Sequence, residues 1–383
     1  AVPGFEKEEY CCKDWDDIRV PAHIQMEGYD APQYANVQYP WEGHEELHPG
    51  QIPERFNPVA SYVRYFHVPE SMKGKRVFIS FQGAESGLAL WLNGTFVGYS
   101  EDSFTPSEFE LTEYLKEGEN KLAAQVFKWT ASSWCEDQDF FRFSGIYRDV
   151  YLYTVPEVHV YDLKIRAIPD ETLKKASLEI VTKTWGKGKL KLTLSRKGEI
   201  LLQDEKALDG EDTCTWEIPN PVLWSAEEPN LYDLDMEVYD ENGMLQEIIP
   251  EKVGFRRFEM KDGIMTLNGK RVVFKGVNRH EFSSVTGRHV SREELIQDIM
   301  TMKQNNINAI RTCHYPDTSL IYQLCDEYGI YMIDETNLES HGSWDVAELT
   351  GDYTDIVPHN KPEWLGMMLD RVNSMYQRDK NHP

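Results

Sequence analysis

The sequence predicts a multidomain protein in which two β-sandwiches precede the first part of an α/β barrel. Short strand-like runs divided by turn signals fill residues 1–155, and regular apolar–polar alternation fills residues 156–258. From residue 259 onward, strand-like and helix-like patterns alternate, which is typical of parallel βαβ units. At 383 residues the chain is longer than one hydrophobic core usually supports, so its length predicts two or three domains.

The first predicted domain, residues 1–155, is an all-β sandwich or jelly roll. Its segment VFISFQGAESGLALWLNGTFVGYS holds several short apolar runs without helical periodicity. Within it, Asn93-Gly94 stands between two such runs, and this dipeptide favours the two-residue turn of a β-hairpin. A series of short strands with these turn signals indicates a sandwich or jelly roll.

The second predicted domain, residues 156–258, is an immunoglobulin-like β-sandwich. Apolar residues alternate with polar ones in KLKLTLS and in YDLDMEVYD. Alternation of this kind gives an antiparallel sheet one face for the core and one for water. About 100 residues of such strands match the size of an immunoglobulin-like domain.

The third predicted domain, residues 259–383, contains the first three βα units of an α/β barrel of the TIM type. A hairpin turning at Asn268-Gly269 leads into the apolar run from Val272 to Val277, and NAIRT and IYMID follow as the second and third strands. These strands lack alternation, as expected of a parallel sheet that is buried on both faces.

Helices are predicted after each of these strands. Ser291 and Glu294 form a capping box, and Asp317 is expected to cap the second helix, which ends at Gly329. The apolar faces of the first and second helices comprise Leu295, Ile299, Met302, Ile321, Leu324 and Tyr328. The last helix begins near Pro362, with Trp364, Met368, Val372 and Met375 on one face.

The segment SHGSWDVAELTGDYTDIVPHN, from Ser340 to Asn360, shows no periodicity. Unstructured loops of this length are uncommon in compact domains and usually serve a function. We therefore expect a functional lid between the third strand and its helix.

The composition limits the partners and the compartment. A formal charge of −25 argues against nucleic acid or an anionic membrane surface as a partner, because both would repel the chain. No apolar stretch approaches the ~18 residues of a membrane-spanning helix. The six cysteines form no CxxC pair, so free thiols in the cytoplasm are expected, or a periplasmic or secreted location if a leader was removed.

The segments KGVNRHEF, NAIRTCHYPD and MIDETNLESHG each run from a strand into histidines and carboxylates. The active site of an α/β barrel lies at the C-terminal ends of its strands. A single histidine there is more often structural, but His280 and His314 follow neighbouring strands about 5 Å apart, which favours one shared pocket. Cys313, next to His314, has no separate orienting group, which disfavours covalent acyl chemistry.

Two acidic motifs follow the third strand. Glu339 and His341 are two residues apart and can point at one cation, although the spacing alone favours a hydrogen-bonded polar loop over an incomplete metal site. The pair Asp334-Glu335 could equally anchor Arg311 across the sheet.

Several long motifs, in this order and spacing, resemble one known family. GVNRHEF, MKQNNINAIRTCHYPD, LCDEYGIYMIDETNLESHG and QRDKNHP are similar to the first three βα units of the β-galactosidases of glycoside hydrolase family 2. GYDAPQYANVQYPW, EDQDFFRFSGIYRDV and LWSAEEPNLY resemble the sandwich domains of the same family. The Glu-x-His pair of ETNLESHG separates this branch from the similar β-glucuronidases.

The resemblance implies a role for each candidate residue in the barrel part. Glu339 and His341 resemble ligands of an active-site Mg²⁺. His280 and His314 resemble residues that hydrogen-bond galactosyl hydroxyls and stabilise the transition state.

The resemblance also implies roles in the jelly-roll domain. Asn36, in NVQYP, resembles an asparagine that reaches the sugar from the first domain. Asp139, the second aspartate of EDQD, resembles one that binds galactose and Na⁺. The residues alone would indicate only a turn residue and a surface acid.

The family reaction is retaining hydrolysis by two carboxyl groups about 5 Å apart. By the family pattern both glutamates are expected beyond Pro383, so this chain alone should be inactive and should depend on the rest of the enzyme or on another copy. A homo-oligomer is the expected state. The alternatives are a family 2 hydrolase acting on glucuronides or mannosides, and a non-catalytic galactoside-binding fragment.

Overall fold

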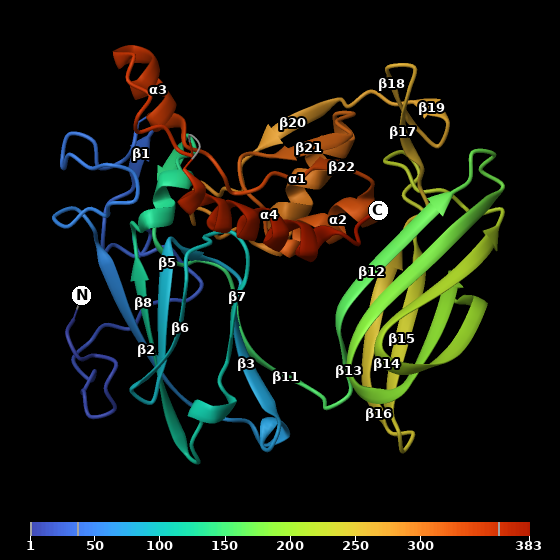
Figure 1. Ribbon diagram of the computed structural model, residues 1–383, viewed down its shortest axis with the longest axis horizontal. Coiled ribbons are helices and arrows are strands. Elements are labelled where there is room, and N and C mark those ends of the chain that lie inside the picture. The colour runs from blue at the N-terminus through green and yellow to red at the C-terminus, as the bar shows by residue number, and fades with distance from the viewer. Residues whose placement is uncertain (1, 37, 359–360) are drawn as a thin grey trace.

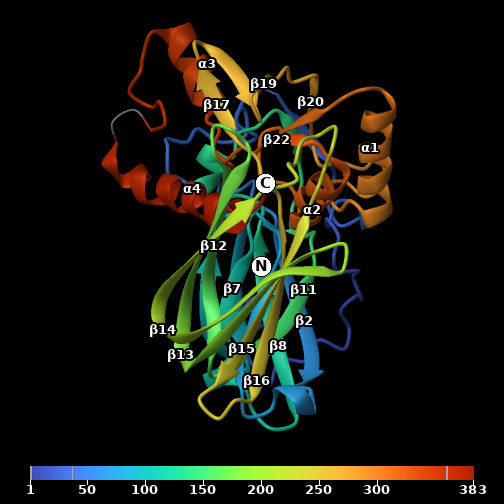
Figure 2. The same cartoon turned by 90° about the vertical axis from the view of Figure 1, so that its right-hand side faces the viewer.

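The computed structural model describes residues 2–36, 38–358 and 361–383. Two β-sandwiches stand side by side, and the βα part of the chain lies above and between them in the view of Figure 1. Figure 2 shows the same arrangement after a quarter turn, with α1 and α4 on opposite sides of the βα part. The predicted fold class, two sandwiches followed by the start of an α/β barrel, is confirmed.

The first sandwich is a jelly roll with two main antiparallel sheets. Its strands are β1 (Gln33–Ala35), β2 (Val59–His67), β3 (Arg76–Phe81), β4 (Ala84–Glu85), β5 (Gly87–Leu92), β6 (Thr95–Ser100), β7 (Ser107–Glu110), β8 (Glu119–Phe127), β9 (Phe140–Arg142), β10 (Gly145–Ile146) and β11 (Val150–Val155). Short 3₁₀ turns cover Glu70–Met72, Thr112–Tyr114 and Ala131–Cys135. The sheet β2-β8-β5-β6 packs on the sheet β11-β3-β7, and β1 pairs with β9. Between the sheets, Leu90 and Leu92 are fully buried.

The predicted hairpin in this domain is confirmed. Asn93 and Gly94 join β5 to β6 with φ angles of 51° and 80°. Positive φ at both central residues is the mark of the turn that matches the twist of paired strands. Asn93 also donates from Nδ2 to the Tyr114 carbonyl at 2.9 Å, which ties the turn to the domain.

The second sandwich is built on one long bent hairpin. Its strands are β12 (His159–Pro169), β13 (Lys175–Arg196), β14 (Glu199–Pro219), β15 (Tyr232–Asp240) and β16 (Leu245–Val253). The first half of β13 pairs with β12 and the second half with β15, so β13 links the two ends of the five-stranded sheet. The change occurs near Gly188, where an added Cβ would lie 2.0 Å from the Tyr239 carbonyl oxygen. The predicted alternation is confirmed because Leu190, Leu192 and Leu194 are all fully buried.

The βα part begins with a small antiparallel sheet and continues with three parallel strands. Its elements are β17 (Phe258–Lys261), β18 (Ile264–Leu267), β19 (Lys270–Arg271), β20 (Gly276–Arg279), α1 (Arg292–Gln304), β21 (Ala309–Thr312), α2 (Ser319–Tyr328), β22 (Tyr331–Ile333), α3 (His341–Thr350), a 3₁₀ turn (Pro362–Trp364) and α4 (Leu365–Asp379). The strand order is β20-β21-β22, with parallel pairing throughout. Ile299, Ile310 and Ile321 are buried in the core between α1, α2 and these strands.

Two local predictions in this part need correction. The first parallel strand is Gly276–Arg279 and does not begin at Val272, whose amide instead bonds back to the Met265 carbonyl. Thr318, not Asp317, is the residue before α2, because Asp317 is fully buried in an ion pair with Arg279 at 2.8 Å.

The predicted lid is only partly without regular structure. α3 occupies His341–Thr350, so the expectation of an unstructured segment there is wrong. The helix buries small residues, Gly342, Ser343 and Ala347, and leaves Trp344 and Leu349 exposed. Its weak apolar periodicity explains why the sequence pattern gave no signal. Residues 359 and 360 lie outside the described part.

The cysteine and membrane predictions can be compared with the described residues. All six cysteines are free thiols there, as predicted, and four of them are buried. No described helix is long and apolar enough to cross a membrane.

Candidate active site

The predicted histidines meet at the C-terminal ends of the first two parallel strands. His280 directly follows β20, and His314 follows β21 by two residues. Their ring centroids are 6.1 Å apart and the rings are nearly perpendicular. The Tyr315 hydroxyl lies 3.4 Å from Nδ1 of His280, and the ring of Tyr315 is buried. The two imidazoles that the strand ends were predicted to bring together therefore lie close to each other.

Glu335, just beyond β22, orients His314. Its Oε2 lies 2.7 Å from Nδ1 of His314, and its Oε1 accepts from Arg311. The amide of Glu335 donates to the Thr312 hydroxyl at 2.9 Å, which fixes the carboxylate beside the neighbouring strand. The sequence indicated the pairing with Arg311 and missed the one with His314, because residues 21 positions apart carry no local signal.

The environment of His280 favours a neutral imidazole. Burial lowers the pKa of His280, and the nearby His314 and Arg288 lower this pKa further, while the Asp139 carboxylate opposes them. A neutral imidazole has one donor and one acceptor nitrogen, which suits a hydroxyl-rich ligand.

The two candidate residues of the jelly roll, Asn36 and Asp139, lie at neighbouring strand ends. Asn36 directly follows β1 and Asp139 directly precedes β9, and the antiparallel register pairs Ala35 with Phe140. The next step along this ribbon therefore brings Asn36 and Asp139 side by side. Both are exposed, and Oδ1 of Asp139 accepts a hydrogen bond from the Tyr34 hydroxyl.

Glu339 and His341 lie at the start of α3. Oε1 of Glu339 and Nδ1 of His341 are 3.4 Å apart, and Nε2 of His341 lies 3.5 Å from Oδ1 of Asp345. Because the first distance is short, one small cation could contact both side chains. Within the described ranges, no group of three histidine, cysteine or acidic side chains is arranged to hold a metal.

The jelly roll also holds the loop that carries this pair. The Glu339 amide donates to the Cys135 carbonyl at 2.8 Å, and the Asp137 amide donates to the Glu339 carbonyl at 3.0 Å. Oδ2 of the buried Asp137 accepts from the Gly342 amide at 2.7 Å. Asp137 thus satisfies a free amide in the first turn of α3, a role that the side chain of Ser340 at the N-cap position does not fill.

Buried ion pairs surround this loop, one within the jelly roll and one between the jelly roll and α4. Arg142 pairs with Asp137 at 2.7 Å, and Arg371 of α4 pairs with Glu136 at 2.6 Å. Asn337 donates to Glu136 at 2.8 Å, so the loop after β22 joins the same network. Sequence reasoning missed these residues, since acidic and basic residues are common and only the fold shows which of them meet.

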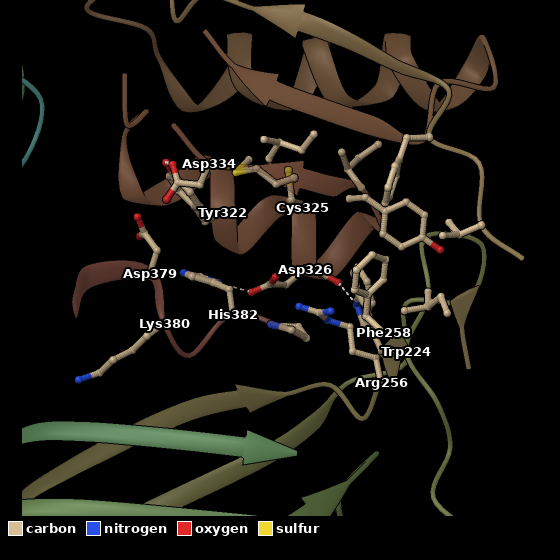
Figure 3. A pocket seen from close by; sticks show the side chains of 18 of the residues that line it. Trp224, Arg256, Phe258, Tyr322, Cys325, Asp326, Asp334, Asp379, Lys380 and His382 are labelled. Carbon is tan, nitrogen blue, oxygen red and sulfur yellow. Dashed lines mark hydrogen bonds and ion pairs between the residues drawn. The ribbon is translucent and has the colours of Figure 1, made fainter. Parts of the chain in front are cut away.

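A separate cavity lies between β22, α4 and the second sandwich. It measures about 480 Å³, and none of the described residues that line it is one of the candidate sugar residues. Figure 3 shows two of its acidic side chains, each with a hydrogen-bond partner. The Tyr322 hydroxyl donates to Oδ1 of Asp334 at 2.7 Å, and Nδ1 of His382 lies 2.5 Å from Oδ2 of Asp326. Burial and the neighbouring Asp379 raise the pKa of Asp334 to about 7.

Comparisons with known proteins match this arrangement. Three models of glycosyl hydrolases family 2 match the chain in turn: the sugar binding domain over residues 7–156, the central family 2 domain over residues 158–256 and the TIM barrel domain over residues 258–383. Among curated proteins, the chain is 52% identical to the β-galactosidase of Halalkalibacterium halodurans, covering 99% of this chain and 38% of that protein. It is also 52% identical to the β-galactosidase of Clostridium acetobutylicum, covering 100% of this chain and 43% of that protein.

A solved structure shares the fold. The β-glucuronidase of Bacteroides uniformis superposes with a TM-score of 0.78 at 24% identity, covering 100% of this chain and 44% of that one. The chain spans less than half the length of these relatives. Because family 2 models match all three domains in order and the relatives share half of its residues, the chain belongs to glycosyl hydrolases family 2.

Proposed function

We propose that this chain forms the amino-terminal part of a retaining β-galactosidase and supplies the walls that bind the galactosyl unit. The observation that carries the proposal is that His280 and His314 meet at the strand ends, with the Asp139 carboxylate of the jelly roll near enough to His280 to act on its pKa. The register of β1 and β9 supports a place for Asn36 beside Asp139. The relatives named β-galactosidases, at about half identity over the whole chain, support the same assignment.

Each of these four residues has a proposed task. The imidazoles of His280 and His314 hydrogen-bond sugar hydroxyls, and Glu335 keeps the His314 ring in place. Asn36 and Asp139 add an amide and a carboxylate from the jelly roll, so the sugar would be held between the domains. Neutral hydroxyls suit these groups, because each can be matched by a donor or acceptor.

The bond-breaking carboxyl groups are proposed to come from outside this chain. Retaining hydrolysis needs one acid/base carboxyl and one nucleophilic carboxylate about 5–5.5 Å apart. Glu335 lies closest to His314, but Arg311 and His314 occupy its two oxygens, so it suits a positioning task. We propose that both catalytic glutamates belong to later strands of the complete enzyme.

Glu339 and His341 are the proposed protein ligands of Mg²⁺. Their 3.4 Å separation fits one shared ion, and Mg²⁺ commonly keeps several waters in place of protein ligands. When bound, the ion would supply positive charge beside the acidic loop after β22. Asp139 is proposed as a Na⁺ ligand through the carboxylate oxygens that also face the sugar.

A β-glucuronidase is the second candidate, because the B. uniformis enzyme of that name shares the fold. The charge of Asp139 favours a galactoside, since its carboxylate would repel the carboxylate of a glucuronide. A galactoside-binding protein without catalysis is the remaining alternative.

A panel of nitrophenyl glycosides tested on the full-length enzyme separates these candidates. We expect cleavage of the β-galactoside with retention of configuration and little cleavage of the β-glucuronide or β-mannoside. Preferential cleavage of the glucuronide, or binding of galactose without any cleavage, would contradict the proposal.

A further inference from the structure

A buried glutamine of the jelly roll connects two segments that carry candidate sugar residues. Gln138 directly precedes Asp139, and its side chain is fully buried. Its Nε2 donates to the His314 carbonyl at 3.2 Å and to Oδ1 of Asn337 at 2.8 Å. Gln138 therefore reaches from the Asp139 segment to the chain after β21 and to the chain after β22.

The direction of the Gln138 amide is fixed by its partners. A carbonyl oxygen can only accept a hydrogen bond, so the amino end of Gln138 must face His314. Asn337 uses its own amino group to donate to Glu136 at 2.8 Å, which leaves its Oδ1 to accept from Gln138. Oε1 of Gln138 has no hydrogen-bond partner among the described residues. The connection to both strand ends therefore depends on the amino group alone.

Asp139 and His314 each have a support that does not involve Gln138. The Tyr34 hydroxyl donates to Asp139, and Oε2 of Glu335 lies 2.7 Å from Nδ1 of His314. The first contact stays within the jelly roll and the second within the βα part. The Gln138 hydrogen bond crosses between the two parts, so it can set the spacing between Asp139 and His314.

Apolar packing lies beside this hydrogen bond. Tyr315, the residue after His314, packs on Phe140 with ring centroids 5.7 Å apart and stacks on Phe104 at 4.0 Å. Burial of apolar surface is non-directional, so these rings hold the segments together without fixing their exact alignment. A hydrogen bond requires a defined distance and angle, and Gln138 supplies that requirement here.

We propose that Gln138 is a positioning residue that holds His314 at the spacing from Asp139 that the galactosyl group requires. The inference rests on the proposed function and goes beyond it, because Gln138 is buried and acts without touching the sugar. Groups of a site must be held to within about 0.5 Å, and a misplacement of about 1 Å can cost about 100-fold in rate. Loss of the Gln138 amino group should therefore weaken sugar binding while every sugar-binding group remains present.

The test measures inhibition of the full-length enzyme by galactose, with nitrophenyl β-galactoside as the substrate. Gln138→Met has a similar length and no donor, so the inhibition constant should rise about three- to tenfold. In an Asp139→Ala background the same change should raise the constant by less than about twofold more, because the spacing to Asp139 then no longer matters. Gln138→Asn, whose amide is one methylene shorter, should act in the same direction and replaces Gln138→Met if that variant does not fold.

Gln25→Met is the matched control, because Gln25 is also a buried glutamine of the jelly roll. Its Nε2 donates to Asp30 at 2.8 Å and to Ser144 at 2.9 Å, and both partners belong to the jelly roll. Gln25→Met should lower the unfolding midpoint, as Gln138→Met does, but should leave the inhibition constant unchanged.

Three results would overturn the positioning role while galactoside cleavage by the wild-type enzyme upheld the proposed function. They are a wild-type inhibition constant in Gln138→Met, an equal rise in Gln25→Met, and a full further rise in the Asp139→Ala background. If the wild-type enzyme neither cleaved the β-galactoside nor bound galactose, the proposed function would fail, and the role of Gln138 with it.

Discussion

The two sides of the three-stranded parallel sheet differ in how they are filled. On the side of the jelly roll, buried charged pairs such as Arg371–Glu136 and Arg148–Glu281 join the domains at 2.6 and 2.5 Å. On the side of β22 and the second sandwich, the described residues surround a cavity of about 480 Å³. The difference indicates that the jelly roll is firmly joined to the βα part beside the candidate site. The side that faces the second sandwich is packed less tightly.

The largest expected effect comes from breaking a buried pair on the filled side. Arg371→Met leaves the Glu136 carboxylate buried without its cation, so the free energy of unfolding should fall by about 3–5 kcal/mol. Urea denaturation measures the change. Adding Glu136→Gln should restore part of the loss, because the uncompensated charge is then removed.

The matched control for this pair lies on the surface of the second sandwich. Lys175 and Glu217 are 58% and 66% exposed, so Lys175→Met should leave the unfolding midpoint close to that of the wild type. If both variants lost a similar free energy of unfolding, burial would not explain the importance of the Arg371–Glu136 pair.

Asp137 is expected to affect the proposed Mg²⁺ ligands Glu339 and His341 without binding the ion itself. Because it caps α3 beside Glu339 and His341, Asp137→Asn in the full-length enzyme should weaken Mg²⁺ binding about 10- to 100-fold and speed amide exchange at Gly342. Calorimetric titration with Mg²⁺ and hydrogen exchange measure the two effects.

Glu85→Gln is the control, because Glu85 pairs with Arg288 in the same interface without touching α3. It should leave Mg²⁺ affinity unchanged. If the Asp137→Asn variant bound Mg²⁺ with wild-type affinity, Asp137 would not be needed to position Glu339 and His341.

Acid should weaken the filled side through His23. Burial first, and then Arg288, lower the pKa of His23 well below its usual value, and its Nε2 accepts from the Arg288 amide at 3.1 Å. Below about pH 6.5, His23 binds a proton in the unfolded chain but stays neutral in the folded chain. The free energy of unfolding should therefore fall by about 1.4 kcal/mol for each unit of decreasing pH. His23→Gln should flatten this dependence between pH 6.5 and 5. An unchanged slope in urea denaturation would contradict the assignment.

The smallest effect on stability is expected on the exposed face of α4. α4 exposes an apolar stripe, Leu365, Leu369, Val372 and Tyr376. Leu369→Glu should change the free energy of unfolding by less than about 0.5 kcal/mol and should reduce apolar dye binding and self-association of the 383-residue chain. Leu201→Glu, at an exposed position of β14, should not reduce them. If the wild-type chain were monomeric and bound no apolar dye, the α4 stripe would not cause self-association, contrary to this prediction.

Local patterns predicted the regular elements well. The Asn93-Gly94 hairpin and the alternation around Leu192 were predictable because each follows from neighbouring residues. The capping box was predictable for the same reason: Glu294 donates its amide to Ser291 at 3.2 Å and accepts from the Ser291 amide at 2.9 Å. α3 was missed because its buried face consists of small residues and its cap comes from another domain.

The sequence predicted the candidate site residues at the strand ends, but it did not predict the residues that hold them in position. The strands placed His280 and His314 together, since parallel strands end at one edge. Asn36 and Asp139 came only from the family resemblance, because a turn asparagine and a surface aspartate carry no pattern of their own. Glu335 as the partner of His314 required the fold, since 21 residues separate them.

The central claim is that a jelly-roll residue binds the sugar together with the strand-end histidines. The most direct measurement is inhibition of the full-length enzyme by galactose after Asp139→Ala. A lost hydrogen bond to a charged group predicts that the inhibition constant rises at least about tenfold, while the unfolding midpoint stays unchanged because Asp139 is exposed. A folded variant with the wild-type inhibition constant would contradict the claim.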